Sequence, residues 1–212
     1  GGRTDQAKKD LRELPIGSQV FSGVPFTILE PASNQGRSAL VLNGQYKPYL
    51  LNKSAPIPVG RKAAAFIFLH GGAWAKGGET AATYEIIYED GGRTNIPIRV
   101  GHEIADWWDP WECPDPNTKL AWTGHNPVAT GKEVGLFMHR WENSRRDQTV
   151  KCIVLHSGSG QSLAGIVAIT GVDAGISQVE WKGLSSLFRK NIASLAFKRP
   201  VSEWLPIKMP WK

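Results

Sequence analysis

The sequence predicts an all-β domain folded as a two-sheet antiparallel β-sandwich of the jelly-roll type. Short runs rich in β-branched and aromatic residues recur along the chain, and Gly, Pro, Asn and Asp bound them. Between residues 18 and 170 there is no long stretch with helical spacing, which a parallel sheet interleaved with helices would need. The predicted strands are residues 18–29, 63–69, 83–88, 95–100, 133–141, 149–156 and 165–170.

The strongest local signal is a hairpin made by the runs 83–88 and 95–100. Asp90, Gly91 and Gly92 lie between the runs and tolerate the positive φ angles of tight hairpin turns. The apolar positions alternate with polar ones in both strands, so one face of each strand is expected to be buried. The expected facing sets are Tyr84, Ile86 and Tyr88 against Ile96, Ile98 and Val100.

Residues 101–131 break the alternation, because they are dense in Trp, Asp, Asn and Pro. We interpret them as long loops on a rigid sandwich, which is where binding residues usually lie. After Asp173 the pattern changes again. Apolar residues over 183–197 recur at helical spacing and predict a short amphipathic helix. The chain therefore divides into a sandwich domain, residues 1–175, and an extension, residues 176–212, that covers the sandwich or leads into a linker.

Composition limits the classes of function. The 212 residues are 41% hydrophobic with 9 Trp, which is typical of a globular domain. No apolar run approaches the about 20 residues of a membrane span, so we expect no membrane partner. The net charge of +6 is scattered and no nucleic-acid-binding motif is present, so we expect no nucleic acid partner. Cys113 and Cys152 lack metal-ligand spacing, and the sequence leaves open whether they form a disulfide.

A catalytic motif is suggested by His70-Gly71-Gly72, which resembles the oxyanion loop of serine esterases. The nearest nucleophile elbow is centred on Ser162. In the α/β-hydrolase fold the chain order is Ser, acid, then His, yet all histidines of this chain precede Ser162. The carboxylate pairs Glu85/Glu89 and Asp106/Asp109 are too ordinary to mark a glycosidase. We therefore expect a protein that is not an enzyme.

A set of phrases spread over the chain in order resembles the galactose-binding-like jelly-roll domains of multidomain bacterial secreted glycoside hydrolases. None of the phrases is specific by itself, and the set carries the resemblance. One departure is Ser144-Arg145-Arg146-Asp147, where such domains tend to have prolines. The phrases are residues 10–17, 21–26, 59–63, 68–70, 84–91, 104–108, 121–122, 141–143 and 168–170.

The resemblance implies a non-catalytic carbohydrate-binding module from a secreted, extracellular protein. Its partners would be a polysaccharide or oligosaccharide and the catalytic module of the same parent chain. It also implies that the His70-Gly71-Gly72 segment is a strand end followed by a glycine loop, with His70 partly buried at the rim. The alternative is a structural accessory domain that packs against a neighbouring catalytic module and binds no glycan.

A sugar ring needs a flat aromatic platform for its C–H face and polar side chains for its hydroxyls. Trp74 and Trp111 stand among Gly, Pro, Asp and Lys and are the better platforms, whereas Trp122 and Trp141 stand in strand-like phrases and are expected in the core. Trp107 and Trp108 face opposite ways if extended, so one is core, and the sequence does not show which. The candidate carbohydrate-binding residues are Trp74, Trp108, Trp111, Asp109 and Asn126.

The same acidic segment raises the question of a metal. Carboxylate oxygens suit a hard cation, so a structural Ca²⁺ is an alternative to plain turn capping at these positions. No other cofactor is expected. The side chains concerned are Asp106, Asp109, Glu112 and Asp115.

Overall fold

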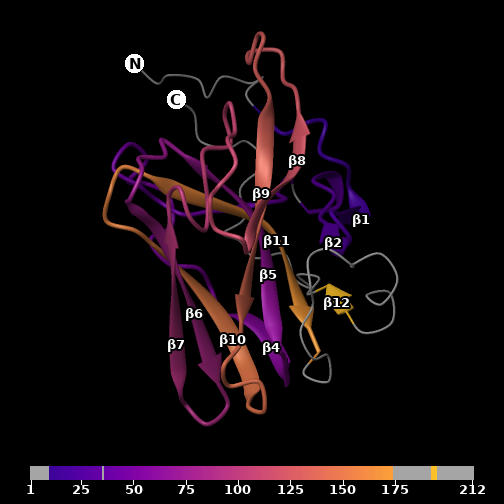
Figure 1. Cartoon of the computed structure of the whole chain (residues 1–212), viewed down its shortest axis with the longest axis vertical. Coiled ribbons are helices and arrows are strands. Elements are labelled where there is room, and N and C mark those ends of the chain that lie inside the picture. Colours follow the sequence, from indigo (N-terminus) through magenta and orange to yellow (C-terminus); the bar gives the residue numbers. More distant parts are fainter. Residues whose placement is uncertain (1–9, 35, 174–191, 195–212) are drawn as a thin grey trace.

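The computed structural model describes residues 10–34, 36–173 and 192–194. This part of the chain is all-β, with antiparallel sheets packed as a sandwich, and it contains one 3-10 turn and no α-helix (Figure 1). The predicted fold class is thereby confirmed. The elements are β1 (Gly17–Phe21), β2 (Val24–Ile28), η1 (Ala32–Asn34), β3 (Leu40–Val41), β4 (Ile57–Lys62), β5 (Ala65–Ala73), β6 (Thr80–Tyr88), β7 (Arg93–Arg99), β8 (Thr118–Gly124), β9 (Val134–Glu142), β10 (Thr149–Ser157), β11 (Leu163–Val172) and β12 (Ile192–Ser194).

The two main sheets have jelly-roll strand order. One sheet runs β4-β10-β6-β7, and the facing sheet runs β11-β5-β9-β8, with β3 and β12 both paired to β11. The eight strands of the jelly roll are obtained by counting from β3 to β11 and leaving out β8, which is an added edge strand. In this count β3-β11-β5-β9 is first-eighth-third-sixth, and β4-β10-β6-β7 is second-seventh-fourth-fifth. A third, two-stranded sheet, β1-β2, is a separate hairpin.

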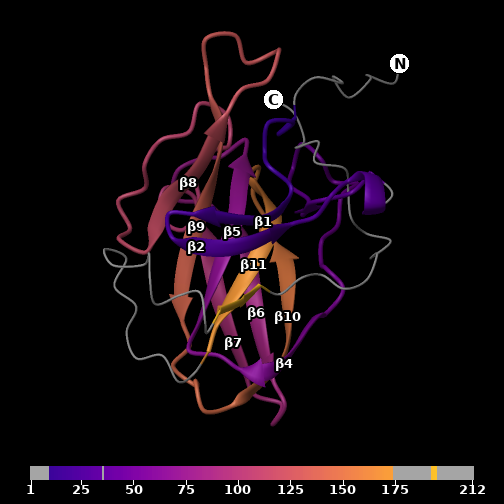
Figure 2. The same ribbon diagram turned by 90° about the vertical axis from the view of Figure 1, so that its right-hand side faces the viewer.

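The central strand β5 is buried on both faces because a layer covers each side of its sheet. Phe66 and Phe68 point toward the sheet that contains β6 and β10, where they join a core with Tyr84. Ile67 and Leu69 point the other way, into a second core with residues of the β1-β2 hairpin. Figure 2 shows that hairpin lying across β9, β5 and β11. The uncharged sequence of β5 fits this double burial, since an ionised side chain would have no water on either face.

The predicted runs from 83 onward coincide with β6, β7, β9, β10 and β11. The first run was wrong as a single strand, because Ser22 and Gly23 turn it into the β1-β2 hairpin. Their φ values of 46° and 84° are the two positive angles that a tight two-residue turn requires. The alternation of apolar residues continues through the turn, so the sequence pattern does not reveal the turn. The second run also extends farther than predicted, to Ala73.

Further corrections concern segments predicted as loops or helix. Strand β8 lies inside the segment 101–131, which was interpreted as long loops, although Trp122 stands in a strand-like phrase. The short β3 and the polar edge strand β4, which contains Pro and Gly, were not predicted. Residues Ile192–Ser194, inside the predicted helix 183–197, form strand β12 against β11, so the helix prediction is wrong there. The rest of the predicted extension 176–212 lies outside the described residues.

Candidate functional site

The His70-Gly71-Gly72 motif lies within strand β5, so the predicted glycine loop is wrong. Gly71 and Gly72 pair with Gly165 and Ala164 of β11, and the Gly72 N–H donates to the Ala105 carbonyl at 2.9 Å. The backbone N–H groups of a strand are hydrogen-bonded to neighbouring strands, whereas those of an oxyanion loop must be free to bind the substrate. The esterase resemblance of this motif therefore ends with the local residue pattern.

His70 is fully buried, not partly buried at a rim, because the two flanking layers enclose β5. Its Nε2 lies 2.9 Å from the Glu103 carbonyl oxygen, and its Nδ1 lies 2.9 Å from the Tyr84 hydroxyl. A carbonyl only accepts, so Nε2 carries the proton and Nδ1 accepts from Tyr84. Burial lowers the pKa of His70 from 6.5 to about 3 and raises that of Tyr84, so both groups stay neutral.

Ser162 is also buried, and its hydroxyl holds the backbone after β5. It lies 2.8 Å from a Glu79 carboxylate oxygen and 3.2 Å from the Trp74 carbonyl, and it accepts the Lys76 N–H at 2.9 Å. Side-chain and backbone hydrogen bonds from Ser162 lower the pKa of Glu79. The partners of this serine thus fix the chain around Trp74.

Trp74 begins the loop after β5 with an unusual backbone. Its φ of 50° is in the left-handed region, which is strained for a bulky residue and costs on the order of 1 kcal/mol. Its carbonyl accepts hydrogen bonds from Gln161 Nε2 and Ser162 Oγ, each at 3.2 Å. The surrounding structure therefore holds the half-buried Trp74 in one position.

Trp74 lies beside two exposed tyrosines and a lysine. We name this group the aromatic surface and define it as Tyr46, Lys47, Tyr49 and Trp74. The Tyr46 and Trp74 ring centroids are 5.7 Å apart, and Lys47 Nζ lies 5.6 Å from the Tyr49 ring and 5.9 Å from the Trp74 ring. Tyr46 is 53% exposed and Tyr49 is 70% exposed. Exposure of two neighbouring tyrosines beside a strained Trp is typical of a binding surface.

The loop that carries the two tyrosines is fixed to the turn before β11. The Gln45 N–H donates to the Gly160 carbonyl at 3.1 Å. Gly44 lies so close to the Gln161 carbonyl that an added Cβ would be 2.8 Å from its oxygen. Tyr46 and Tyr49 were missed at the sequence level. Their only signal was a turn-rich segment, residues 43–49, that contains two tyrosines.

The segment 106–111 carries the other predicted aromatic residues. Trp107 is core, and Trp108 is half-buried with its ring edge-on to Trp107 at 5.5 Å. Trp111 is 44% exposed. The buried Asp106 connects this segment to the Trp74 loop, because its carboxylate accepts the Ala75 N–H at 3.1 Å and the Trp108 N–H at 2.9 Å.

The acidic residues of this region do not converge on one point. Asp106 binds backbone amides, and Asp109 pairs with Lys132 at 2.5 Å. Asp115 caps a turn by accepting the Asn117 N–H at 2.8 Å. Within the described ranges, no group of three or more His, Cys, Asp or Glu residues could hold a metal ion. The two cysteines are free thiols, and burial raises the pKa of Cys113 to about 11.

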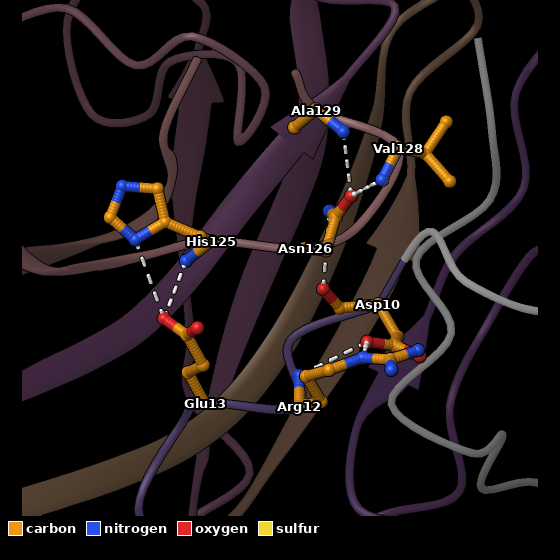
Figure 3. Close-up of polar contacts among 7 residues, drawn as sticks. All are labelled: Asp10, Arg12, Glu13, His125, Asn126, Val128 and Ala129. Atoms are coloured by element: carbon orange, nitrogen blue, oxygen red, sulfur yellow. Dashed lines mark hydrogen bonds and ion pairs between the residues drawn. The ribbon is translucent and has the colours of Figure 1, made fainter. Parts of the chain in front are cut away.

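Asn126 is buried and holds a loop (Figure 3). Its side-chain oxygen accepts the N–H groups of Val128 and Ala129 at 3.0 and 2.9 Å, and its Nδ2 donates to the Asp10 carbonyl at 3.3 Å. Next to it, the Glu13 carboxylate accepts the His125 N–H at 2.7 Å. Asn126 thus joins the N-terminal segment to the loop between β8 and β9, and the structure does not bring it to the aromatic surface.

Comparisons of the chain with protein-family models, curated proteins and solved structures find no match. Among the residues that the structure describes, no helix is both long and apolar enough to cross a membrane.

Proposed function

We propose that this domain is a non-catalytic carbohydrate-binding module that holds a polysaccharide against the aromatic surface. The observation that carries the proposal is the grouping of Tyr46, Tyr49 and Trp74 on rigid loops of a jelly roll. The apolar C–H face of a sugar stacks on such rings, and their contact area is gained with little loss of side-chain freedom. In this proposal the polysaccharide is also the substrate of a catalytic module in the same secreted parent chain.

Polar groups around the rings suit sugar hydroxyls. The Lys47 ammonium lies beside two of the rings, and the Gln161 carboxamide reaches the Trp74 backbone. Because the Tyr46 and Tyr49 rings are exposed rather than enclosed, the surface suits a segment of extended polysaccharide chain. Asp106 joins the Trp74 loop to the segment that carries Trp108, Asp109 and Trp111, and these three residues are proposed as further contacts. Asn126 is left out because backbone groups occupy its amide.

Replacing Tyr49 with Ala should weaken polysaccharide binding about tenfold, because an aromatic anchor at a binding surface contributes about 1–2 kcal/mol. The melting temperature should stay nearly constant, since substitutions at exposed positions usually change stability by less than about 0.5 kcal/mol. The measurement is retention of the intact chain on a panel of soluble and insoluble polysaccharides at several salt concentrations. Binding through stacking should survive moderate salt.

Two variants serve as controls for this experiment. Tyr49→Phe keeps the ring and should keep most of the affinity. Val20→Ala removes an exposed apolar side chain from β1 and should leave retention unchanged. If no polysaccharide retains the unmodified chain, the proposal fails, and the structural accessory domain becomes the better interpretation.

A further inference from the structure

A cleft of about 570 Å³ opens at the side of the sandwich, between β7 and β9. It forms because one sheet ends at β7, whereas the facing sheet continues past β9 into β8. His139 and Trp141 of β9 pair with Phe68 and Phe66, so both side chains are on the inner face of their sheet. The polar and aromatic residues that line the cleft are Asn95, Arg99, Glu103, Asn117, His139 and Trp141.

Three side chains in the cleft have hydrogen-bonding capacity to spare. His139 is 5% exposed and bonds Thr118 Oγ1 through Nδ1 at 2.9 Å, while no described residue bonds its Nε2. Within the same described part of the chain, the carboxamides of Asn95 and Asn117 have no hydrogen-bond partner. A polar group that is almost fully buried and faces a cavity with an unused nitrogen is expected to have a partner there.

The charges that line the cleft are paired. Arg99 binds Glu103 through two hydrogen bonds, of 2.5 and 3.1 Å, and Arg140 binds Glu142 at 2.8 Å. Desolvation lowers the pKa of His139, so its ring is neutral at neutral pH. A charged ligand would lose water on entering the cleft and would find no unpaired charge of opposite sign there. Ligands with a carboxylate or an ammonium group are therefore disfavoured.

The unused Nε2 of His139 is a donor or an acceptor according to the tautomer, each carboxamide offers both a donor and an acceptor, and a hydroxyl group matches either role. Trp141 adds an apolar surface beside them. One face of its ring is packed on Phe66, with centroids 6.4 Å apart and planes 12° from parallel, which holds the indole in place. Trp141 was expected in the core from its strand-like surroundings, yet it is half-buried and lines the cleft.

We propose that this cleft is a second carbohydrate site, which takes one neutral pyranose unit between Trp141 and the polar groups of Asn95, Asn117 and His139. Its volume is within the about 300–1,000 Å³ typical of small-ligand sites. The site is separate from the aromatic surface and does not depend on it. Each of the two sites therefore has its own test.

The test titrates the intact chain with the methyl glycosides of glucose, galactose, mannose and xylose, with methyl glucuronide as the charged probe. NMR follows the ring signals of His139 and the indole N–H of Trp141, and His139→Gln identifies the histidine signals. At least one neutral glycoside should shift both residues saturably with millimolar affinity. The double variant Asn95→Ala/Asn117→Ala should weaken that binding about tenfold, because it removes two hydrogen-bonding groups without disturbing the core.

Tyr49→Ala should leave this binding unchanged, which separates the cleft from the aromatic surface. The proposal is overturned if no neutral glycoside gives a saturable shift, or if the glucuronide alone binds. Unchanged affinity in the Asn95→Ala/Asn117→Ala variant would overturn it as well. Both asparagine side chains are exposed, and the backbone contacts of the two residues do not depend on the carboxamides, so a melting curve should confirm that the variant is folded.

Discussion

Acidification from pH 6.5 to about pH 3 should remove about 5 kcal/mol of folding free energy through His70 alone. Above pH 6.5 the imidazole is neutral in both the folded and the unfolded chain and has no effect. Below that pH the His70 imidazole binds a proton in the unfolded chain but stays neutral in the folded chain, because burial lowers the pKa of folded His70 to about 3. Stability should therefore fall by about 1.4 kcal/mol per pH unit across this window.

Urea unfolding at a series of pH values measures this effect. His70→Gln removes the titration while its carboxamide can still donate to the Glu103 carbonyl and accept from Tyr84. The variant should be less stable at neutral pH but should lose stability less steeply in acid. His125→Ala, at an exposed position, is the matched control and should keep the slope of the unmodified chain. An equal slope for His70→Gln would show that His70 does not control acid stability.

Replacing Trp107 with Ala should lower the free energy of unfolding by about 3–5 kcal/mol, the cost of removing a large buried ring and leaving a cavity. Trp107 is 1% exposed, in the core beneath the β1-β2 hairpin. Its backbone is fixed on both sides, since its N–H donates to Gly72 and its carbonyl accepts from Gly135, each at 2.8 Å. These bonds aim the side chain inward, and few neighbours can move to fill the space.

The comparison variant is Trp111→Ala, which removes the same ring from an exposed position only four residues along the chain. Its effect on stability should be within about 0.5 kcal/mol. Trp108→Ala should fall between the two, because that ring is half-buried. Chemical denaturation of the three variants measures the order. If Trp107→Ala costs no more than Trp111→Ala, the assignment of Trp107 to the core is wrong.

Local pattern was enough to predict the fold class and the strands β6, β7, β9, β10 and β11, because period-two alternation and turn residues act over neighbouring positions. The predicted facing sets of the β6-β7 hairpin are all buried, and Tyr84 lies opposite Ile96. Chain order alone also argued against a hydrolase triad, since each histidine precedes Ser162. The strand and fold-class predictions hold because they depend on residues that are close in sequence.

Which face of a strand is covered, and by what, was decided only by the tertiary structure. Alternation showed that Trp107 and Trp108 differ, but only the β1-β2 hairpin and the bonds to Gly72 and Gly135 assign Trp107 to the core. The aromatic surface joins a loop after β3 to the end of β5, and the cleft joins β7 to β9. Strand order creates these neighbours. The strand order depends on packing between residues that are far apart in the sequence, so a local sequence pattern cannot predict it.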